Sequence, residues 1–273
     1  MKSLLVTLFC VTICFGAKSQ TIDTLIDVGG YRLHFNIIKG KGIPILFESG
    51  GGDDGKVWDD LTKKLYDSIG TTLITYDRAG TGKSEIDTSK INILNEIKGL
   101  ETGLKKLGFT HNLFLVAHSL GGSYSILYSS RNSKKVSGCV FIDINLPCFM
   151  TEQKTKEISS SYANIMDTLK KQRIGVYYLL SNYENTNDLL RATTFPSRIP
   201  STIIGSDFPP YKGVDSVKWK SCIKSFGMLT NHTYVLGKNC GHYIFKDNPD
   251  LVINEIIKLY RQVDLIHKKQ LRK

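Results

Sequence analysis

The chain has 273 residues, enough for one large domain or two small ones, and its 41% hydrophobic and 22% charged residues are typical of a globular protein. The formal net charge of +11 raises the question of nucleic-acid or anionic surfaces, but the basic residues are scattered and no basic run precedes residues 267–273. The composition therefore argues against a nucleic-acid-binding protein.

Residues 1–19 have the pattern of a secretory signal peptide. Lys2 supplies a positive start, an apolar run follows, and the segment 17–19 (Ala-Lys-Ser) resembles a small-residue cleavage site. The apolar run is too short for a membrane-spanning helix. The sequence thus predicts an exported protein, periplasmic or secreted, with no stable membrane insertion after the signal is cleaved.

Cleavage at this point leaves four cysteines, namely Cys139, Cys148, Cys222 and Cys240. An exported chain can pair them as disulfides, but the sequence does not determine which residues pair. Their spacing contains no C-x-x-C motif, so we expect neither a zinc site nor any other metal site.

Strand and helix patterns alternate along the chain. Alternating polar and apolar residues on both sides of Gly29 and Gly30 predict a β-hairpin over residues 22–38. The sequence predicts further strands at 43–47, 71–76, 113–117, 136–142, 201–204 and 233–236, and helices at 57–69, 91–107, 123–130, 214–229 and 249–266. This order predicts an α/β fold: a mostly parallel sheet with helices on both faces and an antiparallel N-terminal hairpin at one edge.

The alternation stops at residues 147–198, which are richer in Lys, Ser, Thr and Asn and contain helical patterns without a clear strand. We expect this segment to form a small helical lid over the carboxyl ends of the strands, where ligands bind in such sheets. The core would then consist of residues 20–146 and 199–273. The aromatic residues of the lid are candidates for lining a substrate pocket: Tyr162, Tyr177, Tyr178, Tyr183 and Phe195.

Ser119 lies between a short apolar strand and a helical pattern, in a segment (117–122) that reads A-H-S-L-G-G. A serine on such a sharp strand-to-helix turn is held out at the end of the sheet, and Gly121 allows the close approach that the turn needs. The segment fits the nucleophile-elbow pattern G-x-S-x-G, with Ala117 in place of the first glycine. The alternative is a serine that caps an ordinary helix.

A serine that attacks a carbonyl group creates an oxyanion, which two converging backbone N–H groups must stabilise. One donor is expected from Leu120, the residue after the nucleophile, and the other from the loop after an earlier strand. The segment 49–52 (Ser-Gly-Gly-Gly) is that loop, and Gly51 is the preferred donor because glycine lets the backbone approach a substrate closely.

Two glycine-rich loops also resemble nucleotide-binding motifs. Residues 50–55 fit G-x-G-x-x-G, but Asp53 and Asp54 would put negative charge beside a pyrophosphate. Residues 80–84 resemble the end of a P-loop, but Asp77 stands where the first glycine of that motif is required. We therefore expect no nucleotide cofactor.

The serine also needs a base and an acid. His242 lies in a loop after the last predicted strand and before the last helix, which brings it to the same sheet edge as Ser119. His118 adjoins Ser119, but adjacent residues at a strand end point to opposite sides. Asp207 and Asp143 both follow strands at the carboxyl edge, and either one gives the chain order Ser, Asp, His.

Together these motifs resemble the serine-nucleophile branch of the α/β-hydrolase family, over roughly residues 25–265. The resemblance implies an oxyanion hole, a lid and no cofactor, with Ser119 as the nucleophile and His242 as the base. The family most often takes its acid from the loop after the strand that precedes the last one, which favours Asp207 and leaves Asp143 as the alternative.

The resemblance also narrows the activity. Epoxide hydrolases and dehalogenases of this family use a carboxylate nucleophile, so Ser119 argues against them. The leading hypothesis is a serine hydrolase, such as a carboxylesterase, lipase or aminopeptidase-like enzyme, that cleaves a small ester or amide through an acyl-enzyme. The alternatives are a non-catalytic or slow-turnover ligand-binding protein on the same fold and a cofactor-free oxygenase or perhydrolase.

The signal pattern generates the first testable prediction. Protein recovered from the native cell should lack residues 1–19, because the cleavage pattern places processing near residue 20. Intact-mass spectrometry of the recovered protein measures this, and a mass that still includes Met1 would refute export by this route.

Overall fold

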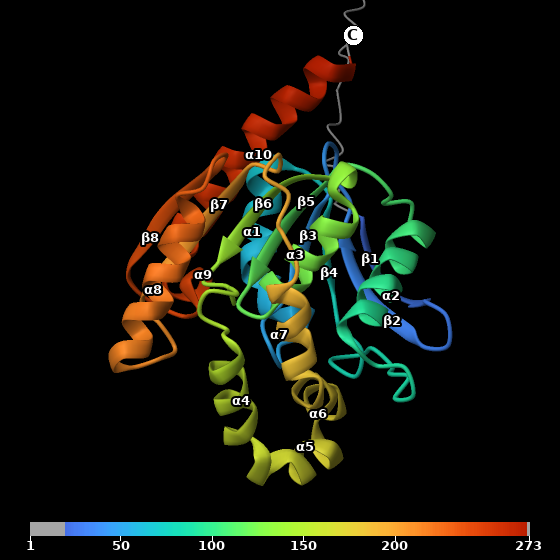
Figure 1. Ribbon diagram of the computed structural model, residues 1–273. Helices are drawn as coiled ribbons and strands as arrows, with labels where there is room; N and C mark the ends of the chain where they lie inside the picture. Colours follow the sequence, from blue (N-terminus) through green and yellow to red (C-terminus); the bar gives the residue numbers. More distant parts are fainter. Residues whose placement is uncertain (1–19, 272–273) are drawn as a thin grey trace, which may run out of the picture.

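The computed structural model describes residues 20–271, so the predicted signal peptide lies outside the described residues. The strands of the described part form one eight-stranded sheet in the order β1-β2-β4-β3-β5-β6-β7-β8 (Figure 1). The strands are β1 (Thr21–Asp27), β2 (Arg32–Ile38), β3 (Ile45–Glu48), β4 (Leu73–Tyr76), β5 (Leu113–His118), β6 (Val136–Ile142), β7 (Ser201–Phe208) and β8 (His232–Gly241).

The sheet is mostly parallel. β2 pairs antiparallel with both β1 and β4, whereas every pairing from β4 through β8 is parallel. The β1–β2 turn passes through Gly29 and Gly30, whose φ angles of 107° and 112° are accessible to glycine at no steric cost. The predicted fold class, with its antiparallel N-terminal pair, is therefore confirmed.

Helices cover both faces of this sheet. The buried cluster on one face takes side chains from α1 (Asp59–Ile69), α9 (Ile244–Asp247) and α10 (Pro249–Leu271). The cluster on the other face includes side chains from α2 (Ile93–Lys106), α3 (Gly121–Arg131) and α8 (Gly213–Gly227). The described chain also contains short 3-10 helices at Gly55–Trp58, Ser133–Lys135 and Ala163–Ile165.

The segment between β6 and β7 is helical, and its later residues, including Tyr183 and Leu190, are buried in the same cluster as residues of α2 and α3. It contains α4 (Glu152–Ser161), α5 (Met166–Gln172), α6 (Ile174–Ser181) and α7 (Tyr183–Arg191). Figure 1 shows these four helices grouped below the sheet, at the end to which the arrowhead of β6 points. We call residues 147–198 the helical insertion.

A disulfide joins the start of the helical insertion to α8. Cys148 bonds Cys222, and their Cα atoms are 5.8 Å apart. Cys139 and Cys240 are buried free thiols in the described chain. The covalent bond thus fixes the beginning of the insertion to a helix of the sheet's outer layer.

β7 and β8 are longer than the sequence pattern predicts. They remain paired beyond the predicted strands, up to Phe208 opposite Gly241. The apolar pattern ends earlier because most of these last residues, including Asp207 and Asn239, are polar or small. Within residues 20–271, no helix has the length and apolar character to cross a membrane.

Candidate active site

Ser119 occupies a strained turn between β5 and α3. Its φ angle is 52°, in the left-handed region that a residue with a side chain seldom adopts. Side chains at the next glycines would clash, since a Cβ at Gly121 would lie 2.4 Å from the Glu48 carbonyl oxygen and one at Gly122 would lie 2.4 Å from the Ile144 Cβ. The two glycines therefore let α3 start close against the sheet. Ser119 is thereby placed at the end of the sheet.

Ser119, His242 and Asp143 form one chain of hydrogen bonds. The Oγ of Ser119 is 2.9 Å from Nε2 of His242, and Nδ1 of His242 is 2.7 Å from Oδ2 of Asp143. Because a carboxylate only accepts hydrogen bonds, the imidazole proton belongs on Nδ1. Nε2 is then free to accept the hydroxyl proton of Ser119, which is the arrangement that general-base catalysis requires.

The carboxylate of Asp143 is fully buried and receives four hydrogen bonds. Oδ1 accepts from the N–H of Ser206 at 3.0 Å and from Nε1–H of Trp219 at 2.9 Å. Oδ2 accepts from the Ser206 hydroxyl at 2.8 Å in addition to His242. These donors stabilise a charge that burial alone would penalise, and they fix the carboxylate against the imidazole.

The structure corrects the preferred acid. Asp207 does not contact His242, since its carboxylate accepts hydrogen bonds from the N–H of Asn239 and from Lys220. The physical reason is the extra length of β7, which stays paired with β8 through a register shift at Asp207. Ser206 faces Asp143, so its neighbour Asp207 is directed away, and the alternative acid, Asp143, lies beside the base.

The proposed oxyanion donors lie together. A Cβ built on Gly51 would be 3.5 Å from Cδ2 of Leu120, so the loop after β3 meets the start of α3 at this point. Within residues 20–271, neither the N–H of Gly51 nor that of Leu120 has an acceptor. Both groups are therefore available to a substrate oxygen near Ser119.

Arg78 orients the loop that carries Gly51. Its guanidinium donates to the carbonyl oxygen of Ser49 at 2.7 Å and to that of Gly50. In a trans peptide the C=O and N–H point in opposite directions. Anchoring the Gly50 carbonyl on Arg78 therefore directs the N–H of Gly51 away from Arg78.

Arg78 is only 4% exposed and lies in a buried polar cluster. The Glu48 carboxylate is 3.9 Å away and the Tyr124 ring centroid is 5.0 Å away. Burial raises the pKa of Glu48 to about 7, and it does the same for Glu96, which accepts a hydrogen bond from Tyr124. The positive charge of Arg78 lowers both pKa values and thereby partly offsets the effect of burial.

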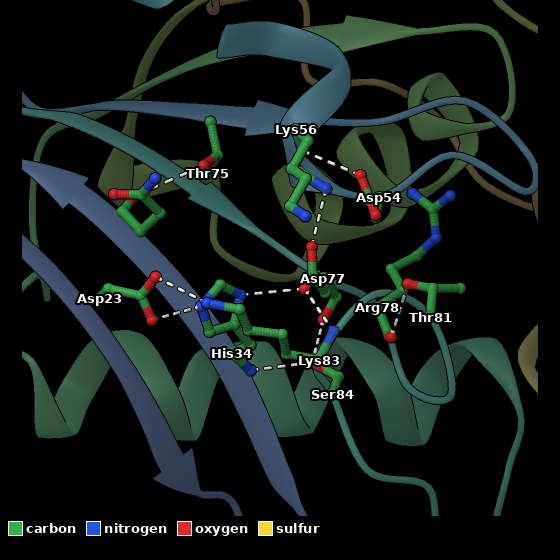
Figure 2. A network of polar contacts seen from close by, with 12 residues as sticks. Asp23, His34, Asp54, Lys56, Thr75, Asp77, Arg78, Thr81, Lys83 and Ser84 are labelled. Carbon is green, nitrogen blue, oxygen red and sulfur yellow. Dashed lines mark hydrogen bonds and ion pairs between the residues drawn. The ribbon is translucent and has the colours of Figure 1, made fainter.

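A second polar network fixes the turn that carries Arg78, and Figure 2 shows Asp77 at its centre. Asp77 accepts hydrogen bonds from the N–H groups of Gly55 and Lys83, both at 2.8 Å. Its Oδ2 also lies 2.9 Å from Nδ1 of His34. The loops after β3 and β4 are therefore tied to one carboxylate, next to the residue that orients Gly51.

His118 packs against His242 and bonds to its backbone. Its Nε2–H donates to the carbonyl oxygen of His242 at 3.0 Å, and the two ring centroids are 4.6 Å apart. Burial, with a further contribution from His242, lowers the pKa of His118 well below its usual range. His118 is therefore neutral near neutral pH and adds no positive charge beside the base.

A cavity of about 390 Å³ opens beside Ser119 and His242. Of the aromatic residues expected to line it, Tyr162 and Tyr183 do so, whereas Phe195 packs against Phe141 with ring centroids 5.4 Å apart. Most of the remaining wall contributed by the helical insertion is apolar: Ile158, Ile165, Leu169, Val176, Leu179 and Leu180.

The cavity also has polar wall groups. Arg173 of the helical insertion lines it and donates a hydrogen bond to the carbonyl oxygen of Gly52. The insertion thus contacts the glycine loop next to Gly51. In the part of the chain that the structure describes, no group of three or more His, Cys, Asp or Glu side chains could hold a metal ion.

Sequence reasoning assigned no role to several residues of this site. The sequence presents Arg78 directly after Asp77, but nothing in it shows that the guanidinium reaches back to the glycine loop. Trp219 and Ser206 are donors to Asp143 from α8 and β7, and no local pattern indicates either contact. Each depends on segments that meet only in the folded chain.

Comparison with known proteins agrees with this architecture. The model of the α/β-hydrolase fold family matches residues 43–172. An esterase from Thermogutta terrifontis is 16% identical with a TM-score of 0.65, and the match covers 90% of this chain and 100% of that one. An esterase from Exiguobacterium antarcticum is 15% identical with a TM-score of 0.67, covering 88% of this chain and 100% of that one.

Among curated proteins, the chain is similar to "Uncharacterized protein YqjL" of Bacillus subtilis strain 168, at 26% identity over 238 residues. That match covers 86% of this chain and 90% of the relative. The resemblance to α/β-hydrolases that the motifs predicted is confirmed, and the chain has the α/β-hydrolase fold.

The hydrogen bonds of Asp143 generate a prediction about the acid. Asp143→Asn should lower kcat by about 10⁴-fold, because an amide in this place favours the wrong tautomer of His242. Asp207→Asn is the matched control and should keep near wild-type turnover. Ester turnover and thermal melting of both variants are the measurements, and a loss confined to Asp207→Asn would contradict the geometry.

Arg78 generates a second prediction. Arg78→Lys keeps a positive charge near Glu48 but cannot hold both carbonyl groups with one planar fork. Loss of one oriented oxyanion donor should reduce kcat by about 10²-fold with little change in KM. Arg131→Lys, at a partly exposed arginine paired with Glu101, is the control. Unchanged kcat in a folded Arg78→Lys protein would contradict this role.

Proposed function

We propose that this protein is a serine hydrolase that cleaves a small ester or amide substrate through an acyl-enzyme intermediate. The fold supports hydrolase activity. The observation that carries the proposal is the hydrogen-bonded chain from Ser119 Oγ through His242 to Asp143, with distances of 2.9 and 2.7 Å.

Each group has a defined task in this mechanism. Ser119 Oγ attacks the scissile carbonyl carbon while Nε2 of His242 takes the hydroxyl proton. The N–H groups of Gly51 and Leu120 stabilise the oxyanion, and the imidazolium, held by Asp143, returns the proton to the leaving group. A water molecule then attacks the acyl-enzyme with His242 again as base, which releases the acid and restores Ser119.

The alternative is a binding protein on the same fold with little or no turnover. A merely bound ligand needs neither a base at 2.9 Å from Ser119 nor two free N–H groups beside it. Both features support catalysis over simple binding. A perhydrolase uses the same triad, so acyl transfer to water and acyl transfer to hydrogen peroxide should be compared directly.

Export remains part of the proposal. The disulfide between Cys148 and Cys222 supports it, because such bonds persist in oxidising compartments and are rare in the cytosol. The substrate would then be encountered outside the cytoplasm.

Ser119→Ala tests the mechanism. The variant should lose about 10⁶-fold in kcat toward p-nitrophenyl esters, because the nucleophile is absent while the fold is kept. Ser123→Ala is the matched control, since Ser123 is a buried serine one turn further along α3 whose hydroxyl has no partner in the described chain. A fluorophosphonate probe should label wild type and Ser123→Ala but not Ser119→Ala. Equal turnover in all three proteins would rule the mechanism out.

A further inference from the structure

Asn145 is a buried polar residue in the cavity wall for which the mechanism has no use. It lies two positions after Asp143, is only 6% exposed, and lines the cavity beside Ser119. Its backbone N–H donates to the carbonyl oxygen of Ser119 at 3.1 Å. In the described part of the chain, its carboxamide makes no hydrogen bond, although the cavity borders it.

The cavity reaches the polar atoms of this carboxamide, which are not fully enclosed by protein. Buried polar side chains in folded proteins nearly always have a partner, which can be water or a ligand. The amide of Asn145 offers two donors and one acceptor oxygen. Because no protein group in the described chain pairs with this amide, it can pair with a polar group of a bound molecule in the cavity.

The other wall groups restrict what that partner can be. The described residues that line the cavity include no Asp or Glu, so nothing there would balance a substrate ammonium group. Arg173 is the one lining side chain with a permanent positive charge. The remaining wall of the helical insertion is mainly apolar, which suits a short carbon chain. An oxygen substituent on such a chain therefore fits better than a nitrogen cation.

The position of Asn145 relates this oxygen to the reacting atoms. The backbone N–H of Asn145 is hydrogen-bonded to the carbonyl oxygen of Ser119, so the two residues are direct neighbours in the cavity wall. A substituent that meets the carboxamide would then lie near the carbonyl carbon that Ser119 attacks.

We infer that Asn145 determines specificity by hydrogen bonding to a hydroxyl or oxo group on the acyl chain close to the scissile carbonyl. The preferred substrates are then esters or amides of hydroxy or oxo acids rather than of plain fatty acids. This inference rests on the proposed function, because it concerns the substrate of the same site. A site that pairs a buried amide with substrate oxygen discriminates against the analogue that lacks the oxygen.

Matched esters test the inference. The kcat/KM of wild type toward p-nitrophenyl 2- or 3-hydroxybutyrate should exceed that toward p-nitrophenyl butyrate by about 10-fold or more. Asn145→Leu has a similar size without the amide, and it should reduce this ratio to about one. Asn145→Ala gives the same comparison if the leucine variant melts at a lower temperature than wild type.

Asn187→Leu is the control variant. Asn187 is a fully buried asparagine of α7 that does not line the cavity, and its amide donates to the carbonyl oxygen of Tyr183. Its substitution should leave the substrate ratio unchanged whatever it does to stability. A wild-type ratio near one for both hydroxy esters, or a ratio that survives both Asn145 variants, overturns the inference.

A binding measurement separates this inference from the proposed function. Titration calorimetry of the mature wild-type protein with hydroxybutyrate and with butyrate needs no turnover. Tighter binding of the hydroxy acid by about 10-fold, lost in Asn145→Leu, supports the role of Asn145 even if no ester is cleaved. Equal binding of the two acids, in a protein that a fluorophosphonate labels at Ser119, overturns the inference and leaves the proposed hydrolase intact.

Discussion

The carboxylate of Asp143 is the interaction on which the rest of the site depends. It is fully buried, and its four donors come from three different parts of the chain: the strand residue Ser206, the helix residue Trp219 and the loop residue His242. A buried carboxylate without these donors would be strongly unfavourable. The same requirement that keeps it paired therefore brings β7, α8 and the loop after β8 into one fixed arrangement around the imidazole.

The opposite side of the site depends on Arg78. Its guanidinium reaches back from the loop after β4 to two carbonyl groups of the loop after β3, which sets the direction of the Gly51 N–H. The two sides meet at Ser119, whose strained turn projects the hydroxyl between them. The catalysis that we propose depends on groups that are oriented before the substrate arrives, and here buried charges provide that orientation.

The sequence by itself determined the fold class and half of the site. Strand and helix periods alternate clearly enough to predict a parallel sheet with an antiparallel hairpin. The glycines after Ser119 identify a sharp strand-to-helix turn, because small residues are required where the helix starts against the sheet. His242 was identifiable from its place in the chain order, since loops after parallel strands meet at one sheet edge.

Tertiary structure alone decided which acid meets His242 and which residues orient the two loops. Asp207 and Asp143 both follow apolar strand patterns, so local sequence does not distinguish them. The outcome depends on how far β7 stays paired with β8, because one further residue of strand turns a side chain to the other face. Arg78, Trp219 and Asn145 likewise act through contacts between segments distant in sequence, which periodicity and motif spacing do not encode.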